Sequence, residues 1–280
     1  MVFQLKIKNN SSPQPKVPKV EEIKSVFSYK LGNPEFSFKN YLVKIIKDPD
    51  PILDFAKKLR YDSFFKNKKD ITNDSDEFDK FCDHLVVIDT AISPNFVVGT
   101  YRLLLKKQRE KYKRFYSESE FDLSNFFNIK NISMLEAGRS CVHEDYRDGR
   151  IIKLLWKGLA SYIISNQVDL IFGCASFPSS YHLKFSNQLS YLYHYHKPPK
   201  KYISNPLENV KVEFKISTLK DICIDEEFRS LPPLIKAYIR AGAWVNPGVV
   251  IDKKFNTTDV LIILKSENII KKYSKLSVKR

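Results

Sequence analysis

The stretch MLEAGRSCVHEDYRDGRIIKLLWKGL, residues 134–159, decides the fold of this chain. It begins with the strand-like segment MLEAGRSCV, passes through a short loop that holds Arg147, Gly149 and Arg150, and ends in a helix-like segment. The helix-like segment extends to residue 166, and its apolar residues recur at every third or fourth position, as on one face of an amphipathic helix. The stretch therefore predicts a strand, a loop and a helix in direct succession.

The loop of this unit is a candidate phosphate site. A loop that opens a helix presents unpaired backbone N–H groups and the positive end of the helix dipole. The side chains of Arg147 and Arg150 can add charge-assisted hydrogen bonds to a phosphate. Gly149 by itself is weak evidence, since an ordinary turn also accounts for a single glycine. Both interpretations stay open at this point.

Strand-like and helix-like segments alternate on both sides of this unit. Strands are predicted over residues 40–46, 84–90, 96–105, 134–142, 170–177 and 259–265, and helices over 48–65, 151–166 and about 179–193. The second and third of these strands are joined by the turn-forming residues SPN and are expected to form a hairpin. The alternation predicts an α/β (α+β) fold in which helices flank a mixed central sheet.

Length and composition fit one folded domain. The chain has 280 residues, of which 43% are hydrophobic, and this is enough for a sizeable core. We expect a disordered polar tail over residues 1–25, a single domain over 26–270 and a basic C-terminal tail over 271–280. No apolar run reaches the ~18–20 residues that span a bilayer, and the N-terminus lacks an apolar signal core, so we expect a cytoplasmic protein.

The net charge of +15 is informative without being specific. It fits a nucleic acid, an anionic membrane or an acidic protein partner equally well. The segment KKQREKYKR, residues 106–114, carries six basic residues and one acid, and could be a docking patch or a solvated surface. A non-catalytic basic binding module remains an alternative, although no helix-turn-helix, zinc-finger or RNA-binding motif supports it.

The cysteines argue against a metal site. Cys82, Cys141, Cys174 and Cys223 are far apart and show no spacing typical of zinc ligands. We therefore expect no metal, and four buried, reduced thiols in a reducing cytoplasm.

Glu136 is the most unusual residue of the strand over 134–142. A carboxylate in an apolar strand is expensive to bury without a partner, so it is either ion-paired or held as a general base with a raised pKa. Strict alternation places Glu136 and Arg139 on opposite faces of the sheet. If both serve one site, a bulge near Gly138 must shift the register by one residue, and we predict this bulge.

Taken together, these segments resemble a known family. The unit over 134–159 resembles the fourth strand, pyrophosphate loop and third helix of the GNAT acyltransferases, in which the fourth and fifth strands splay apart. EAGRSCV, CDHLVVID, VVGTYRLL, LIFGCASFP and LPPLIKAYIRAGAWV…FNTTDVLIIL are similar to the ornithine-lipid N-acyltransferases, a haemolysin-like branch of that superfamily. This resemblance covers roughly residues 40–265. The acyl-homoserine-lactone synthases are a more distant resemblance, because the tryptophan usual soon after the residue matching Phe64 is missing.

The resemblance implies roles for a set of polar residues. They are Glu136 and Arg139 as catalytic residues, Arg60, Asp76, Asp79 and Arg102 for the amino-acid substrate, and Ser140, Val142, Arg147, Gly149 and Arg150 for phosphopantetheine. Arginines can hold a substrate carboxylate in a bidentate manner, and aspartates can hold an ammonium group. The two aspartates could equally form internal ion pairs with Arg60 and Arg102, and the two roles can coexist.

The activity implied by the resemblance is transfer of a (3-hydroxy)fatty acyl group from acyl carrier protein to the α-amine of L-ornithine. The phosphopantetheine thioester of that carrier protein is then the co-substrate, with no tightly bound cofactor and no nucleic-acid partner. The basic charge leaves room for peripheral contact with the anionic inner face of the cytoplasmic membrane. The alternative enzymes are an acyl-homoserine-lactone synthase and an acyltransferase for another amino acid such as glycine.

Overall fold

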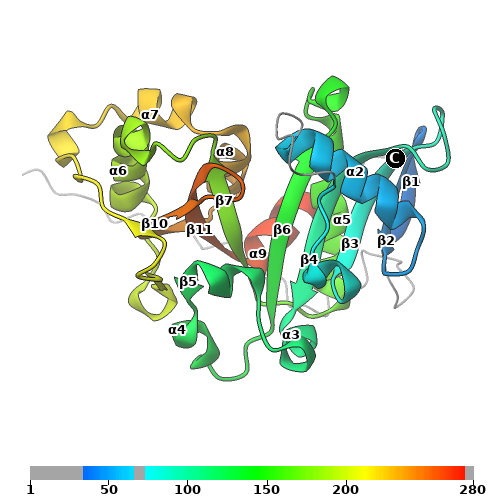
Figure 1. Cartoon of the computed structure of the whole chain (residues 1–280), viewed down its shortest axis with the longest axis horizontal. Helices are drawn as coiled ribbons and strands as arrows, with labels where there is room; N and C mark the ends of the chain where they lie inside the picture. Colours follow the sequence, from blue (N-terminus) through cyan, green and yellow to red (C-terminus); the bar gives the residue numbers. More distant parts are fainter. Residues whose placement is uncertain (1–33, 66–72, 275–280) are drawn as a thin grey trace, which may run out of the picture. The chain divides into compact units, whose positions relative to one another are not determined.

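A large mixed sheet forms the centre of the fold (Figure 1). The structure is a computed structural model and describes residues 34–65 and 73–274. Within these residues nine strands pair in the order β1-β2-β3-β4-β6-β7-β11-β10-β9. Their bounds are β1 Glu35–Phe38, β2 Tyr41–Ile46, β3 Asp83–Asp89, β4 Val97–Leu105, β6 Met134–Val142, β7 Leu170–Phe177, β9 Lys211–Val212, β10 Trp244–Asp252 and β11 Thr257–Lys265. Only the pair β6–β7 is parallel among these described strands.

Helices and smaller elements surround the sheet. The α-helices are α2 Ile52–Phe64, α3 Lys106–Tyr112, α4 Ser124–Phe127, α5 Arg150–Ser165, α6 Ser186–Tyr195, α7 Ile224–Ser230, α8 Pro233–Arg240 and α9 Ser266–Ser274. The 3₁₀ helices are η1 Glu77–Lys80, η2 Tyr116–Ser119, η3 Glu144–Tyr146, η4 His182–Phe185, η5 Lys200–Tyr202 and η6 Leu219–Asp221. A two-stranded sheet pairs β5 (Phe121–Asp122) with β8 (Asn205–Pro206).

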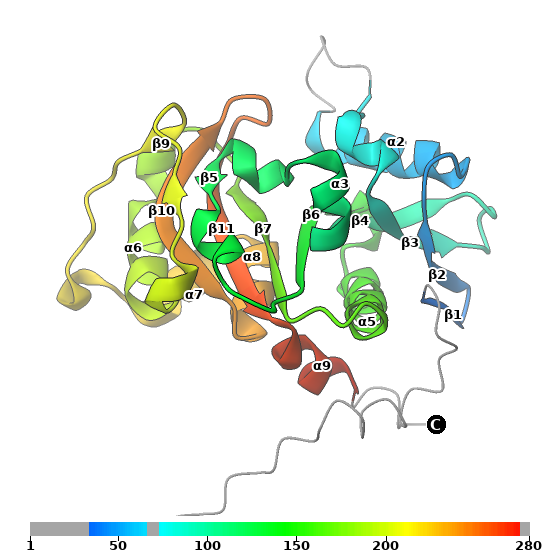
Figure 2. The same cartoon turned by 90° about the horizontal axis from the view of Figure 1, so that it is seen from below.

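The helices cover both faces of the sheet, because its strands alternate two sets of apolar side chains. On β3, Leu85 and Val87 pack into the core beneath α5, whereas Val86 and Ile88 pack against α2. Figure 2 shows α2 and α3 on one side of the sheet and α5 and α9 on the other. The α2 side also carries the segment 115–127, whose aromatic residues pack against β6, β7 and β11. This α2 side carries most of the polar residues considered below.

The predicted fold is confirmed. The strands predicted over 134–142 and 170–177 have the bounds of β6 and β7, and the predicted hairpin is the antiparallel pair β3–β4. The helix predicted over 179–193 is divided into η4 and α6, and the one predicted over 48–65 begins only at Ile52. The elements β1, α3 and α9 were not predicted, because short or strongly charged segments carry little periodic signal.

The predicted domain limits remain a prediction. The polar tail expected over residues 1–25 lies outside the described residues, and so do residues 275–280. Residues 271–274 form the end of α9. All described residues belong to one compact unit. None of the described helices has both the length and the apolar character needed to cross a membrane.

Candidate active site

A bulge in β6 brings Glu136 and Arg139 to the same face of the sheet. Thr100 of β4 pairs with Cys141, but Arg102 pairs with Gly138, so β6 contains one residue more than β4 between these pairs. Arg139 lies within the bulge and has a φ of +50°. A left-handed conformation costs a non-glycine residue on the order of 1–3 kcal/mol, so the packing around Arg139 must hold it in place. The predicted bulge is confirmed.

The parallel strands β6 and β7 separate after a short paired segment, as Figure 1 shows. Their last paired residues are Glu136 and Phe172. One residue further, a Cβ atom on Gly173 would lie 2.3 Å from the carbonyl oxygen of Ala137, so only glycine allows this close approach. The predicted splaying of these two strands is confirmed.

A cavity of about 730 Å³ lies where the strands separate. Its wall includes Glu136 and Arg102 from the α2 side of the sheet, and Leu234 and Tyr238 from α8 on the opposite side. The cavity therefore extends through the sheet at the gap between β6 and β7. A volume of this size is in the range of ordinary small-molecule sites.

Glu136 lines this cavity and is 5% exposed. One carboxylate oxygen accepts a hydrogen bond from the Tyr116 backbone N–H at 2.8 Å. The other accepts bonds from the N–H of Ser117 at 2.7 Å and from its hydroxyl at 2.6 Å. Burial raises the pKa of Glu136, and the hydrogen bonds from Ser117 and Tyr116 offset part of the increase. A carboxylate that is oriented by donors but has no ion-pair partner among the described residues suits a general base.

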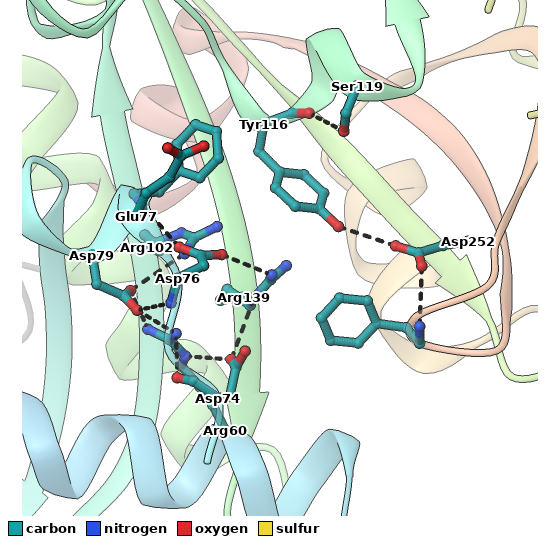
Figure 3. A network of polar contacts seen from close by, with 12 residues as sticks. Arg60, Asp74, Asp76, Glu77, Asp79, Arg102, Tyr116, Ser119, Arg139 and Asp252 are labelled. Atoms are coloured by element: carbon teal, nitrogen blue, oxygen red, sulfur yellow. Dashed lines mark hydrogen bonds and ion pairs between the residues drawn. The ribbon is translucent and has the colours of Figure 1, made fainter. Parts of the chain in front are cut away.

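Figure 3 shows an arginine–aspartate network, and its member Arg102 lies close enough to Glu136 to lower the pKa of that carboxylate. Its members are Arg60, Asp74, Asp76, Asp79, Arg102 and Arg139. Arg60 contacts Asp79 in a bidentate manner, at 2.8 and 3.0 Å, and its Nε lies 2.7 Å from Asp74. Three guanidinium groups thus meet three carboxylates. The internal ion pairs that the sequence left open are present.

The remaining contacts close the network around Asp76. Arg102 lies 2.5 Å from Asp76 and 3.3 Å from Asp79, and Arg139 lies 3.2 Å from Asp76. Burial alone would raise the pKa of Asp79, but the hydrogen bonds and charge of Arg60 outweigh it and hold that pKa well below its usual range. Of the six side chains, Arg102 and Arg139 line the cavity, whereas Arg60 has no exposed surface.

Two aromatic rings hold the Arg139 guanidinium in the cavity. The ring centroid of Tyr116 lies 4.7 Å from it and that of Phe255 lies 4.5 Å from it. Cation–π contacts of this kind stabilise a guanidinium without neutralising its charge. The hydroxyl of Tyr116 points away toward Asp252, to which it donates a hydrogen bond of 3.0 Å (Figure 3). Tyr116 therefore links Arg139 to the opposite wall of the cavity.

The predicted phosphopantetheine residues are only partly brought together. Ser140 and Arg147 line the cavity. Gly149 is the N-cap of α5 with a φ of +90°, and Arg150 is largely exposed and paired with Asp148. Neither of these two residues belongs to the cavity wall, and the same is true of Val142 at the end of β6.

Sequence reasoning missed an acidic cluster beside the cavity, which consists of Glu120, Asp252 and Asp259. One carboxylate oxygen of each residue lies within 4.8 Å of the others. Asp252 and Asp259 line the cavity, and Glu120 follows η2 directly. Asp259 could have been found by the argument used for Glu136, since it too is a carboxylate in an apolar strand. Glu120 carries no such signal, because its segment has no clear periodicity.

The prediction for the cysteines is partly wrong. Cys82 and Cys141 are buried, but Cys174 is half-buried and lines the cavity, and Cys223 is exposed. Cys174 alternates with apolar neighbours on β7, whose edge faces the gap between the strands, and Cys223 precedes α7 on the surface. Burial raises the pKa of the Cys141 thiol to about 12, which makes it a poor nucleophile.

The chain is similar to several known proteins. The acetyltransferase (GNAT) domain family matches residues 59–157. A Brucella abortus protein named L-ornithine N(alpha)-acyltransferase is 37% identical over 230 residues, which are 78% of this chain and 82% of that protein. An Agrobacterium fabrum protein of the same name is 34% identical over 233 residues, or 79% of this chain and 80% of that protein. A solved CoA-dependent acyl-homoserine lactone synthase superposes with a TM-score of 0.47 at 11% identity, over 83% of this chain and 87% of that one.

These findings exclude a non-catalytic binding module. A module that binds through surface charge has no need of a buried carboxylate and arginines that line one cavity, and the relatives carry the name of an enzyme. The protein is an acyltransferase with a GNAT domain, and it belongs to the L-ornithine Nα-acyltransferase family.

Proposed function

We propose that the protein transfers a fatty acyl group, with or without a 3-hydroxyl, from the phosphopantetheine thioester of acyl carrier protein to the α-amine of L-ornithine. This proposal rests mainly on one observation: the side chains of Glu136, Arg102 and Arg139 line the same cavity, which lies between the splayed strands β6 and β7. The names of the relatives support ornithine as the acceptor and its α-amine as the site of acylation.

The donor arm enters between β6 and β7. Along these two described strands no pair follows Glu136 and Phe172, so backbone groups further along β6 are available to the amides of pantetheine. A Cβ placed on Gly138 would meet no atom within 4 Å, which leaves room beside this backbone. Arg147 and the N-terminus of α5, capped by Gly149, receive the phosphate.

Glu136 acts as the general base, directly or through a water molecule. It takes a proton from the α-ammonium of the acceptor, and the amine nitrogen attacks the thioester carbonyl carbon. A backbone N–H of β6 stabilises the resulting oxyanion. The C–N bond forms and the C–S bond breaks. The pantetheine sulfur leaves as a thiol with the second proton that the attacking nitrogen gives up, while Glu136 holds the first. The raised pKa of Glu136 brings this carboxylate closer to neutral pH, where a general base is most effective.

The arginine–aspartate network divides into two functions. Arg102 and Arg139 line the cavity and hold the carboxylate of the amino acid. Arg60 is fully buried, so it positions Asp79 and the neighbouring loop instead of contacting substrate. Asp76 joins the two groups through its contacts with Arg102 and Arg139.

Basic surface segments receive the acidic carrier protein. The segment 106–114 forms α3 and the residues after it, and Lys107, Lys111 and Lys113 are exposed there. Such charges speed encounter with an acidic partner. The same charges favour peripheral contact of a cytoplasmic enzyme with an anionic inner leaflet, at about 1 kcal/mol for each basic residue near the surface.

The test is product analysis with purified components. The enzyme is incubated with acyl–acyl carrier protein and, separately, with ornithine, glycine, lysine and S-adenosylmethionine, and the products are identified by mass spectrometry. We expect Nα-acyl-ornithine as the main product. Acyl-homoserine lactone or N-acyl-glycine as the main product, with no acyl-ornithine, overturns the proposal.

A further inference from the structure

The acidic cluster of Glu120, Asp252 and Asp259 has no role in the mechanism above. It comes from three separate elements, since Glu120 follows η2, Asp252 ends β10 and Asp259 lies on β11. Glu120 and Asp259 are each only 4% exposed. Three acidic groups gathered in this way repel one another unless a proton or a cation is present.

Glu120 and Asp259 have carboxylate oxygens without a hydrogen-bond partner among the described residues. Neither carboxylate oxygen of Glu120 accepts a hydrogen bond of normal geometry from the described residues, and the same holds for Oδ1 of Asp259. The thiol of Cys174 lies close enough to Glu120 to interact with its carboxylate, and this contact lowers the pKa of Glu120. Only Asp252 is well bonded, through the Tyr116 hydroxyl and the N–H of Phe255, both at 3.0 Å. Buried carboxylates without donors are uncommon and need a physical explanation, such as a functional role or a bound ion.

The titration of the cluster agrees with this geometry. Burial, together with the charges of Asp259 and Asp252, raises the pKa of Glu120 to about 8. Burial likewise raises the pKa of Asp259 to about 6, although its contacts with Thr257 and Ser176 act in the opposite direction. A bound cation would allow all three groups to ionise at neutral pH.

The position of the acidic cluster indicates which kind of cation it would bind. Asp252 and Asp259 line the cavity that Glu136 and Arg139 also line. Tyr116 connects the two walls, because its ring contacts Arg139 while its hydroxyl bonds Asp252. An amino acid bound with its carboxylate at the arginines can therefore extend its side chain toward the acidic cluster.

We propose that Glu120, Asp252 and Asp259 bind the side-chain ammonium of a diamino acid acceptor and select it over acceptors that lack this group. The inference rests on the proposed function and assigns the substrate side chain a subsite of its own. The three N–H groups of an ammonium match three carboxylates, one bond to each. The aspartates of the arginine–aspartate network are less suited to this ligand, because arginines already neutralise them.

The test compares ornithine with norvaline, which has the same carbon chain without the terminal amine. Kinetic constants are measured with acyl–acyl carrier protein for the wild type, Glu120→Gln and Asp259→Asn. The exposed acid Asp225, on α7 outside the cavity wall, provides the matched control Asp225→Asn. We expect both cluster variants to raise KM for ornithine about 10- to 100-fold, the scale of a lost charged hydrogen bond. KM for norvaline and the activity of the control should stay unchanged.

Binding without catalysis gives a second readout. Ornithine should raise the melting temperature of the wild type more than norvaline does, and this difference should shrink in both cluster variants. An unchanged ornithine-to-norvaline preference in the variants, with active wild type, overturns the inference and leaves the proposed function intact. A wild type that acylates neither compound overturns the proposed function itself.

A divalent metal is the competing occupant. Activity that is lost on chelation and restored by Mg²⁺, Ca²⁺, Mn²⁺ or Zn²⁺, together with metal binding that Asp259→Asn abolishes, shows that the cluster is a metal site and overturns the ammonium subsite. Activity and ornithine preference that persist in a chelator support the subsite.

Discussion

Two groups of three carboxylates lie near the same cavity, and they differ in their charge balance. The first group reaches the cavity through its partners Arg102 and Arg139, and the second through its own members Asp252 and Asp259. The arginine–aspartate network pairs each aspartate with at least one guanidinium, whereas the acidic cluster has no cation bonded to it among the described residues. The pKa shifts of the two groups are therefore opposite. The pKa of Asp79 lies below its usual range, whereas the pKa of Glu120 is raised to about 8. Carboxylates whose charge is neutralised by arginines stabilise the fold, whereas carboxylates without a cation are available to bind a cationic ligand.

The first prediction concerns Glu136, which resembles neither group because it is bonded to neutral donors. Glu136→Gln should lower kcat about 10²–10⁴-fold, the usual scale for a lost general base. Steady-state kinetics with acyl–acyl carrier protein and ornithine measure the effect. Wild-type turnover in this variant would remove Glu136 from the mechanism.

Ser117→Ala provides the control for that result. It removes one hydrogen bond that lowers the pKa of Glu136, so the acidic limb of the pH–rate profile should move to higher pH. The charges that also face Glu136 include Arg102, which lowers its pKa. A profile that stays in place would show that the limb reports another group.

The second prediction breaks the balanced group. Arg60→Leu leaves Asp74 and Asp79 buried without their main partner and should lower the free energy of unfolding by about 3–5 kcal/mol, as measured in urea. Lys58→Ala on the same helix is the matched control, because its pair with Asp62 is exposed and should contribute less than about 0.5 kcal/mol. Equal effects of the two variants would mean that Arg60 is not a structural residue.

The third prediction relaxes the unbalanced group. Asp259→Asn removes a like charge from the acidic cluster and should raise the free energy of unfolding at pH 8 by about 1 kcal/mol, even as it weakens ornithine binding. A stabilised protein with a weaker substrate preference is the signature of a binding group. Loss of stability would instead indicate that the contacts of Asp259 with Thr257 and Ser176 are structural.

The fourth prediction concerns pH. Glu120 has an ordinary pKa of 4.5 and a folded value of about 8, so its protonation stabilises the folded state fully below pH 4.5, and this stability is lost as the pH rises through about 8. The groups that face it are Asp252, Asp259, Glu136 and Cys174. The melting temperature of the wild type should fall from pH 6 to pH 9 by about 5–10 °C more than that of Glu120→Gln. Parallel curves would contradict the raised pKa.

Much of the fold could be predicted because apolar residues repeat with the period of each element. β6 and α5 show this clearly, and their order along the chain already indicated the unit that binds phosphate in related folds. The bulge was predictable because two polar residues three positions apart cannot otherwise face one site. The arginine–aspartate ion pairs could be proposed from the residue types alone. Their distances and the bidentate contact of Arg60 could not be predicted from the sequence.

The rest of the site depends on contacts between distant parts of the chain. No local pattern indicates that the backbone of Tyr116 and Ser117 bonds Glu136, or that Phe255 packs on Arg139. The position of Phe255, in the turn between β10 and β11, follows from strand order, which places these two strands beyond β7. The acidic cluster was missed for the same reason, since its members come together only after β11 pairs with β7.

The close approach at Gly173 has a consequence for how this enzyme can change. Because the Ala137 carbonyl occupies the space of a side chain, even a single methyl group at position 173 would act as a wedge and move the two strands further apart. The distance between β6 and β7 at this point therefore depends on the absence of a side chain at position 173. A substitution there could widen the gap between the two strands while every charged group of the site stayed the same.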